Sequence, residues 1–348
     1  MRRSQDFETG VAVAIDDSSQ IGEARRTATA VALAAGLTET DAGKLALIAT
    51  EAATNITKHA SRGEIVLRSI VGQGLRGVDV IAIDSGPGIT DLDRALADGY
   101  STAGSPGHGL GAMARLATDF DIFTGAGVGT VLAARVESRH GLVPSQTVFD
   151  VGVVRVPKRG ESECGDAWGM GRNDDGRATF TVADGLGHGS SAADASRRAV
   201  ELAGEHPTER PAAVLAAIHA GLRATRGAAV AVAEVTEDAA TVRFAGLGNI
   251  SAALVGPTAS KSLVSHNGIA GHEMRKIQEF TYEWPADALL VMHSDGISAR
   301  WDLQRYRGLA QRHPSVVAGV LYRDFSRGRD DALIVVVRPA SRHGTRPR

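Results

Sequence analysis

Four acidic positions in the second half of the chain have the residue types that hold divalent cations. They are Asp166, Asp184 in Asp-Gly-Leu-Gly-His-Gly, Asp295 in His-Ser-Asp-Gly-Ile, and the pair Asp330 and Asp331. Carboxylates gathered at strand ends repel each other unless a cation compensates their charge. Oxygen-only ligands favour Mg²⁺ or Mn²⁺ over Zn²⁺. The pattern indicates a metal site, although a single Asp-Gly more often marks a hairpin turn.

Two polar residues in the first half, Glu51 and Asn55, are spaced for one face of a helix. A carboxylate beside an amide oxygen suits a hard cation and a reacting hydroxyl group. The alternative is a solvated helix face, which is the commoner meaning of this spacing when it stands alone.

Glycine-rich segments follow this helix. Asp84 ends an apolar run and precedes Gly86 and Gly88, so its carboxylate could accept a hydrogen bond from an exocyclic amine while a ligand ring approaches the backbone. A tight turn is the alternative. Further on, a run containing Gly107, Gly109, Leu110 and Gly111 opens a helix. Free N–H groups at a helix start favour phosphate oxygens, but the run is equally compatible with a flexible loop.

These residues must be positioned by two sets of elements. The first set has apolar strand-like runs at 10–16, 64–71, 78–84, 119–124 and 129–136, and helical spacing at 18–35, 39–60 and 110–117. Thr38 with Asp41 resembles a capping box at the start of the second helix. The second set has strand-like runs at 147–156, 177–184, 228–235, 240–246, 250–255, 287–293 and 332–338, and helical spacing at 189–204 and 210–225. Many strands around two helices predict an α+β sandwich.

Composition narrows the class of protein. The 348 residues predict two domains, and the net charge of −2 offers no basic field for nucleic acid or anionic lipid. The N-terminus has no signal-peptide pattern, and no run approaches 18 apolar residues, so we expect no membrane span. The single cysteine, Cys164, excludes an intrachain disulfide and suits the cytoplasm, which is the expected location.

Three motifs in the first half of the chain, the Glu51–Asn55 pair, the Asp84 segment and the glycine run at 107–111, have an order and spacing that resemble the GHKL ATPase superfamily. The resemblance is closest to the RsbT-type serine kinases. The similarity covers about residues 8–137 and includes Asp98–Thr102 and Gly129-Thr130. It implies a Bergerat-type α/β sandwich that binds ATP and Mg²⁺. It also implies that Glu51 orients or deprotonates a substrate serine and that Asn55 ligates Mg²⁺. The remaining implied contacts are Asp84, Gly86, Gly88 and Thr130 around adenine, and Gly107, Gly109, Leu110 and Gly111 around the phosphates.

The acidic motifs together resemble the SpoIIE-type branch of the PPM phosphatases, nearest to the RsbX type, over about residues 147–338. This resemblance implies an α-β-β-α sandwich with two Mn²⁺ or Mg²⁺ ions. Asp184 would bridge the ions, the Gly185 carbonyl, Asp295 and Asp330 or Asp331 would complete the site, and Asp166 would lie beside it. Activated water would attack phosphoserine or phosphothreonine without a covalent enzyme intermediate. Cys164 is then a buried filler and not a nucleophile.

Domain limits follow from both resemblances. We expect an ATP-binding domain at 8–138, a linker at 139–146, a phosphatase domain at 147–339 and a disordered tail at 340–348. His188 could donate a proton to the leaving alkoxide or cap the helix that starts near 190, and capping is favoured.

The leading hypothesis is a bifunctional regulator that phosphorylates and dephosphorylates STAS-type anti-sigma antagonist or stressosome proteins. A second hypothesis keeps only the phosphatase active and makes the first domain an ATP sensor. A third is a binding protein that sequesters a sigma factor or a downstream regulator. The oligomeric state is left open, with a homodimer among the alternatives.

Overall fold

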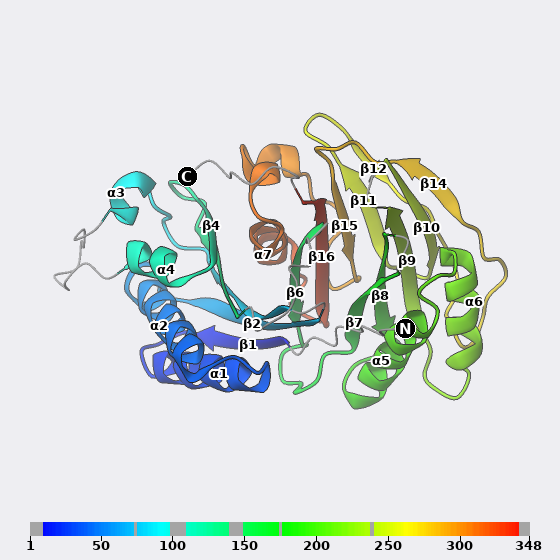
Figure 1. Cartoon of the computed structure of the whole chain (residues 1–348), viewed down its shortest axis with the longest axis horizontal. Coiled ribbons are helices and arrows are strands. Elements are labelled where there is room, and N and C mark those ends of the chain that lie inside the picture. The colour runs from blue at the N-terminus through cyan, green and yellow to red at the C-terminus, as the bar shows by residue number, and fades with distance from the viewer. Residues whose placement is uncertain are drawn as a thin grey trace.

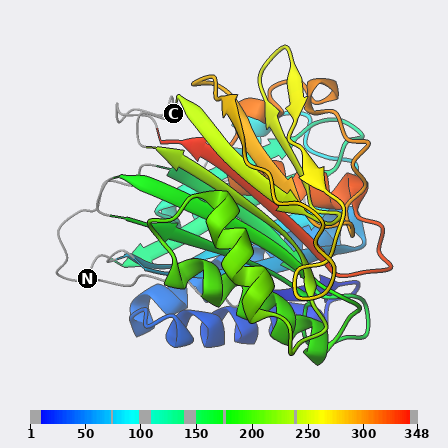
Figure 2. The same cartoon turned by 90° about the vertical axis from the view of Figure 1, so that its right-hand side faces the viewer.

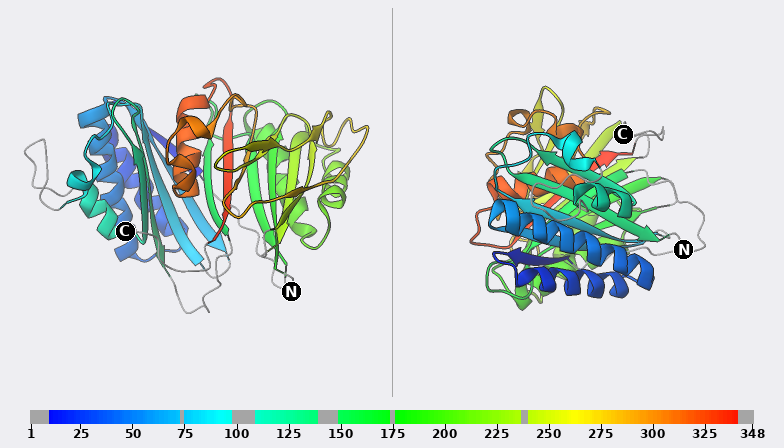
Figure 3. Two further views of the ribbon diagram at one scale, coloured as in Figure 1. Left: turned by 90° about the horizontal axis from the view of Figure 1, so that it is seen from above. Right: turned by 90° about the vertical axis from the view of Figure 1, so that its left-hand side faces the viewer.

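Three β-sheets stacked face to face, with helices between and outside them, form the framework of the chain (Figures 1 and 3). The computed structural model describes residues 10–72, 75–97, 109–138, 149–173, 176–236 and 240–340. The predicted linker 139–146, Gly107 and residues 341–348 of the predicted tail lie outside these residues. The domain limits therefore stay predictions.

The first sheet is antiparallel and built only from the first half of the chain. Its order is β1 (Gly10–Ile15), β2 (Gly63–Gly72), β3 (Leu75–Asp84), β5 (Thr130–Ser138) and β4 (Asp119–Thr124). The helices packed on one face are α1 (Gln20–Ala34), α2 (Glu39–Asn55) and α4 (Leu110–Leu116), with a short α3 (Leu92–Leu96) nearby. Thr38 caps α2 as predicted, because its Oγ1 accepts a hydrogen bond from the Asp41 N–H at 3.1 Å.

The second half forms two further sheets that pack against each other. One has the order β13 (Ser265–His266), β10 (Thr241–Leu247), β9 (Ala228–Thr236), β8 (Arg177–Gly185) and β7 (Asp166–Arg172), with β14 (Phe280–Glu283) also paired to β10. The other has the order β12 (Ser260–Ser262), β11 (Ser251–Val255), β15 (Leu289–His293), β16 (Ala332–Pro339) and β6 (Phe149–Val156). Phe180, Phe244 and Leu333 belong to the apolar cluster between these two sheets.

Helices complete the layers. Two of them, α5 (Ser190–Glu205) and α6 (Pro211–Gly221), cover the outer face of the β7–β10 sheet (Figure 2). The third, α7 (Pro314–Phe325), lies between the β6–β16 sheet and the free face of the first sheet (Figure 3, left). The predicted α+β class, with an α/β sandwich followed by an α-β-β-α sandwich, is therefore confirmed.

Several elements of the structure were not predicted, and α7 and β7 are the longest of them. Helix α7 reads Pro-Ser-Val-Val-Ala-Gly-Val-Leu, and its β-branched residues and glycine lower helix propensity. Strand β7 contains two glycines, which interrupt the apolar run expected of a strand. The other short unpredicted elements are β12, β13, β14, α3 and the 3₁₀ turns Leu303–Arg305 and Leu309–Gln311. Tertiary burial outweighs the low helix propensity of α7, because every residue from Pro314 to Leu321 is buried.

Helix α7 approaches both neighbouring layers closely because glycines stand at its contacts. A Cβ on Gly319 would lie 2.6 Å from Cγ1 of Val131 on the first sheet. On the other side, a Cβ on Gly152 of β6 would overlap the backbone of Pro314 and Ser315. Real Cβ atoms do not approach other atoms so closely, so both glycines are needed for the observed layer spacing. The first sheet, α7 and the β6–β16 sheet thus share one apolar cluster.

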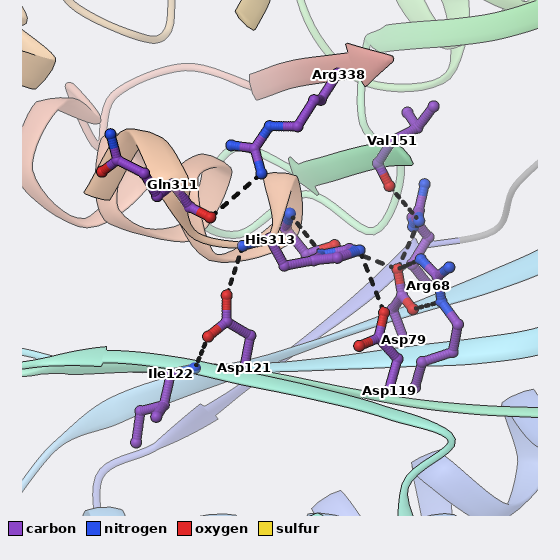
Figure 4. Close-up of polar contacts among 11 residues, drawn as sticks. Arg68, Asp79, Asp119, Asp121, Ile122, Val151, Gln311, His313 and Arg338 are labelled. Carbon is purple, nitrogen blue, oxygen red and sulfur yellow. Dashed lines mark hydrogen bonds and ion pairs between the residues drawn. The ribbon is translucent and has the colours of Figure 1, made fainter. Parts of the chain in front are cut away.

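A buried ionic network lies at the same interface (Figure 4). The carboxylate of Asp79 accepts hydrogen bonds from Arg68 at 2.5 Å and from Arg135 at 2.6 Å, and its side chain is 3% exposed. Burial opposes ionisation, but the two guanidinium groups outweigh it and hold the pKa of Asp79 far below its ordinary value. Arg68 also donates to the Val151 carbonyl of β6, and the Ser315 hydroxyl of α7 lies 3.4 Å from the Asp79 carboxylate.

Replacing Asp79 tests this network. Asp79→Ala leaves two buried guanidinium groups without their carboxylate, so we expect a loss of about 3–5 kcal/mol in the free energy of unfolding. The measurement is the urea midpoint followed by tryptophan fluorescence, since Trp168 lies under Arg68 with 5.9 Å between the guanidinium carbon and the ring centroid. Asp287→Ala, at an exposed position, is the control and should change stability by less than about 0.5 kcal/mol. Equal midpoints for both variants would contradict the assigned role.

No helix in the described part of the chain combines the length and apolar character needed to span a membrane.

Candidate active sites

The first candidate site begins on α2. Glu51 and Asn55 are both half-buried, while Ala52 and Ala53 between them are buried against the sheet. Directly after Asn55 the helix changes to a π-helical turn, Ile56–Ala60, and Ser61 follows with φ of 66°. Such turns and left-handed non-glycine residues are uncommon and cluster at functional sites. The sequence did not indicate this irregular backbone, because it has no breaker residue before position 60.

Asp84 lies at the end of β3, where its backbone pairs with Thr130 of β5. Its Oδ1 accepts hydrogen bonds from the N–H of Gly86 at 2.8 Å and of Thr130 at 3.2 Å. Burial raises the pKa of Asp84, and these two hydrogen bonds partly oppose the shift. Its Oδ2 has no hydrogen-bond partner among the described residues, so it can accept one from a ligand.

The positions around Asp84 require glycine because a side chain there would overlap neighbouring atoms. A Cβ on Gly86 would lie 2.7 Å from the Ala60 Cβ, and Gly88 has φ of 72° with the Gly125 carbonyl directly where its Cβ would be. Gly129, with φ of 71°, faces the Asp84 carbonyl in the same way. The loop after β3 is therefore pressed against both the end of the α2 segment and the β4–β5 turn.

The glycine-rich run before α4, which we call the lid, is only partly described. Gly109 is the N-cap of α4, Gly111 lies in its first turn, and Leu110 is buried in the core beside α2. Gly107 lies outside the described residues. The structure thus brings α2, the Asp84 loop and α4 to one layer of the molecule, and the assigned ligand contacts stay predictions.

The second candidate site gathers acids from four segments. Asp166 and Asp184 are direct partners across β7 and β8. Asp295 follows β15, and Asp330 and Asp331 precede β16. The last two segments touch, because a Cβ on Gly296 would overlap the Asp331 carbonyl. The structure therefore brings these segments together, and the metal-ligand roles of the acids stay predictions.

Electrostatics shows how crowded these carboxylates are. Burial, followed by the charges of Asp295, Asp330 and Asp331, raises the pKa of Asp184 to about 7. Burial and then Asp184 raise the pKa of Asp166 well above its ordinary value. Like charges at short range in a buried setting disfavour ionisation. The surroundings of the cluster therefore disfavour ionisation of the Asp166 and Asp184 carboxyl groups.

The donor set fits divalent cations. Oδ1 of Asp331 accepts the Lys158 N–H at 2.8 Å, whereas its Oδ2 is buried without a hydrogen-bond partner. An orphaned buried oxygen in an all-oxygen cluster is the arrangement that Mg²⁺ or Mn²⁺ would satisfy. Among the described residues, no three acidic, histidine or cysteine side chains already stand in a ligating arrangement.

Three residues that sequence reasoning missed hold these acids in place. Ser294 Oγ donates to Asp166 Oδ2 at 2.6 Å, and Asn249 Nδ2 donates to Asp295 Oδ2 at 2.7 Å. Arg155 Nε donates to the Asp166 carbonyl at 2.7 Å. No local sequence pattern links distant residues such as Asn249 and Arg155 to these acids. Their roles follow from sheet pairing, which sequence spacing does not reveal.

The structure contradicts the expectation for His188 and confirms the one for Cys164. The favoured capping role of His188 is wrong: α5 has Gly189 at its N-cap without a side-chain cap, and His188 Nδ1 instead lies 2.7 Å from Glu161 Oε1. Cys164 is buried, and burial raises the pKa of its thiol, so its predicted role as a filler is confirmed.

Comparisons with known proteins match both halves. A family model described as histidine kinase-like ATPase domain matches residues 15–136, and one described as Stage II sporulation protein E (SpoIIE) matches residues 174–339. The serine/threonine-protein kinase RsbT of Bacillus subtilis is 35% identical over 111 residues, which is 32% of this chain and 84% of RsbT. The chain belongs to the RsbT family.

The RsbT-like domain is joined to a phosphatase domain. The phosphoserine phosphatase RsbX of Bacillus subtilis is 24% identical over 147 residues, 42% of this chain and 73% of RsbX. A solved structure from work on the bacterial stressosome as a modular system controlling secondary messenger signalling covers 55% of this chain and 99% of its own, with a TM-score of 0.51 and 26% identity. The chain is thus a fusion of an RsbT-like kinase domain, of an ATP-binding type, and a SpoIIE- and RsbX-like PPM serine phosphatase domain, of a metal-dependent type.

Removing one carboxylate should stabilise the metal-free protein. Because the folded pKa of Asp184 lies near 7 and its ordinary value is 3.8, the folded state holds a proton that the unfolded state lacks between these values. Stability of the metal-free protein therefore falls as pH rises from about 4 to 7 and stays reduced above 7. We expect Asp184→Asn to raise the Tm of EDTA-treated protein at pH 8 by at least about 2 °C.

The same experiment with Mn²⁺ distinguishes the removal of a crowded carboxylate from a change in side-chain packing at position 184. Mn²⁺ should raise the Tm of the unaltered chain and leave that of Asp184→Asn nearly unchanged. Differential scanning fluorimetry at pH 5 and pH 8 provides the readout, and the Asp184→Asn gain should shrink at pH 5, where the carboxyl is already protonated. A lower Tm for Asp184→Asn at pH 8 would contradict the electrostatic account.

Proposed function

We propose that this chain is a bifunctional signalling enzyme that adds phosphate to, and removes it from, serine or threonine residues of STAS-type anti-sigma antagonist or stressosome proteins. The observation that carries the proposal is the convergence of five aspartates in the second half, in a chain whose first half places Glu51, Asn55 and Asp84 on neighbouring elements. The likeness to RsbT and RsbX supports opposed activities.

In the kinase half, the residues would act by positioning. Asp84 Oδ2 would accept a hydrogen bond from the adenine amine, and Gly86 and Gly88 leave the backbone open to the ring. Asn55 would hold Mg²⁺ through its amide oxygen, and Glu51, one helical turn away, would orient the substrate hydroxyl group and take its proton. The lid glycines Gly107, Gly109 and Gly111 would direct N–H groups at the phosphates. Phosphoryl transfer depends mainly on such positioning and charge neutralisation.

In the phosphatase half, Asp184, the Gly185 carbonyl, Asp295, Asp330 and Asp331 would hold two divalent cations. Bound cations supply water activation and neutralisation of phosphoryl charge. Asp331 is buried and Asp330 exposed, so the two would face opposite sides of the site. Ser294 fixes Asp166 beside the site, and Asn249 fixes Asp295. These hydrogen bonds would orient both carboxylates toward bound cations.

A paired assay tests both activities. The protein is incubated with a STAS-domain protein, radiolabelled ATP and Mn²⁺, and phosphate on the STAS protein is followed with time. Asn55→Ala should reduce phosphate uptake by at least roughly 100-fold, because a ligand of the reacting complex is lost. Asp184→Ala should reduce phosphate removal by a similar factor and let the phosphorylated STAS protein accumulate.

The control is Asp287→Ala, an exposed aspartate of the phosphatase half, which should leave both rates unchanged. Intact ATP binding without transfer to any STAS protein would instead favour an ATP sensor joined to a phosphatase. Unchanged rates in both Asn55→Ala and Asp184→Ala would refute the site assignments.

A further inference from the structure

Helix α7 belongs to the phosphatase half of the chain but is fastened to the kinase sheet at its N-terminal end (Figure 4). The N–H of His313, the N-cap of α7, donates to Asp121 Oδ2 of β4 at 2.5 Å, and Arg312 donates to Asp121 Oδ1 at 3.1 Å. The Ser315 hydroxyl reaches the buried Asp79 carboxylate. These contacts fix where α7 starts relative to the first sheet.

The C-terminal turn of α7 reaches the nucleotide loop. Arg323 Nη1 donates to the backbone carbonyl of Asp84 at 3.4 Å, and the absent Cβ of Gly129 would lie 3.0 Å from the same nitrogen. The Arg323 side chain is 5% exposed, and its Nε and Nη2 donate to Asp324 at 2.7 and 2.9 Å. In the same turn, the Tyr322 hydroxyl donates to Glu64 of β2 at 2.8 Å. A guanidinium held in this way is a fixed part of the Asp84 loop.

The same turn is also bonded to the acid cluster. The Phe325 carbonyl accepts the Ser298 N–H at 2.9 Å, and the Arg327 N–H donates to the Gly296 carbonyl at 2.8 Å. Gly296 adjoins Asp295 and is pressed against the Asp331 backbone. The chain from Phe325 therefore leads, through bonds to the Asp295 loop, directly into Asp330 and Asp331. A shift of the last turn of α7 would move backbone at both candidate sites.

We propose that Arg323 is a positioning residue for the nucleotide pocket, supplied by the phosphatase half, and that the last turn of α7 couples nucleotide binding to phosphatase turnover. The coupling rests on the proposed function, since it needs a nucleotide at Asp84 and phosphoryl chemistry at the acid cluster. A ligand that holds the Asp84 loop favours one position of Arg323, and the bonds at Gly296 and Ser298 carry that position to the acids. Linkage makes the effect reciprocal for binding free energies.

The test uses the full chain with excess Mn²⁺, p-nitrophenyl phosphate as phosphatase substrate and the non-hydrolysable analogue adenylyl imidodiphosphate as nucleotide. We expect saturating analogue to raise kcat by at least about 5-fold, because it favours one position of the turn that both sites share. Arg323→Met keeps the buried stem but loses the guanidinium, so it should weaken analogue binding by roughly 5-fold and bring the ratio of kcat with and without analogue close to one. Arg323→Lys, which keeps a cationic donor, should restore part of that ratio.

A second variant leaves both sites untouched. Gly319→Ala places a methyl group against Val131 and displaces α7 from the first sheet, so it should also bring the kcat ratio close to one while the chain still binds the analogue. Arg275→Met, at an arginine whose side chain is 89% exposed, is the matched control and should keep the wild-type ratio.

The outcomes separate the two proposals. A chain that binds no analogue or hydrolyses no p-nitrophenyl phosphate would overturn the proposed function itself. A chain that does both, but whose kcat ratio is one before any substitution, or whose ratio survives both Arg323→Met and Gly319→Ala, would overturn the coupling alone.

Discussion

Close packing of one helix between two sheets is the constraint on which the rest of the molecule depends. Helix α7 can occupy that layer only because Gly319 and Gly152 remove the side chains that would separate it from its neighbours. Burying its apolar surface on both sides places the free face of the kinase sheet inside a shared cluster with the phosphatase. The two halves are therefore joined by a core and not only by the chain that connects them.

The buried ionic network at this interface adds specificity to the apolar contact. Asp79 is satisfied by Arg68 and Arg135 from its own sheet, while Ser315 and the Val151 carbonyl bring groups from the other half to the same point. A buried charge of this kind tolerates few alternative positions, because any displacement leaves it partly unpaired. Apolar packing sets how closely the layers approach, and the network sets their register.

The acid cluster shows the opposite use of charge. Asp166 and Asp184 pair with each other across two strands, and burial, followed by the charge of neighbouring carboxylates, raises the pKa of both. Hydrogen bonds from Ser294 and Asn249 orient the carboxylates but do not neutralise them. The surrounding sheets supply the rigidity that keeps these acids together although burial and like charge disfavour their ionisation.

The sequence by itself determined most of the elements and the positions of the acidic and glycine-rich motifs at their ends. Period-two and helical patterns located most strands and helices, Asp-Gly motifs at strand ends marked the acids, and glycines after Asp84 marked the nucleotide loop. Only the tertiary structure decided α7, whose valines and glycine disfavour a helix locally but whose burial on both faces requires one. It likewise decided the partners Ser294, Asn249, Arg155 and Arg323, because contacts between distant segments depend on sheet register and layer packing, which local spacing does not encode.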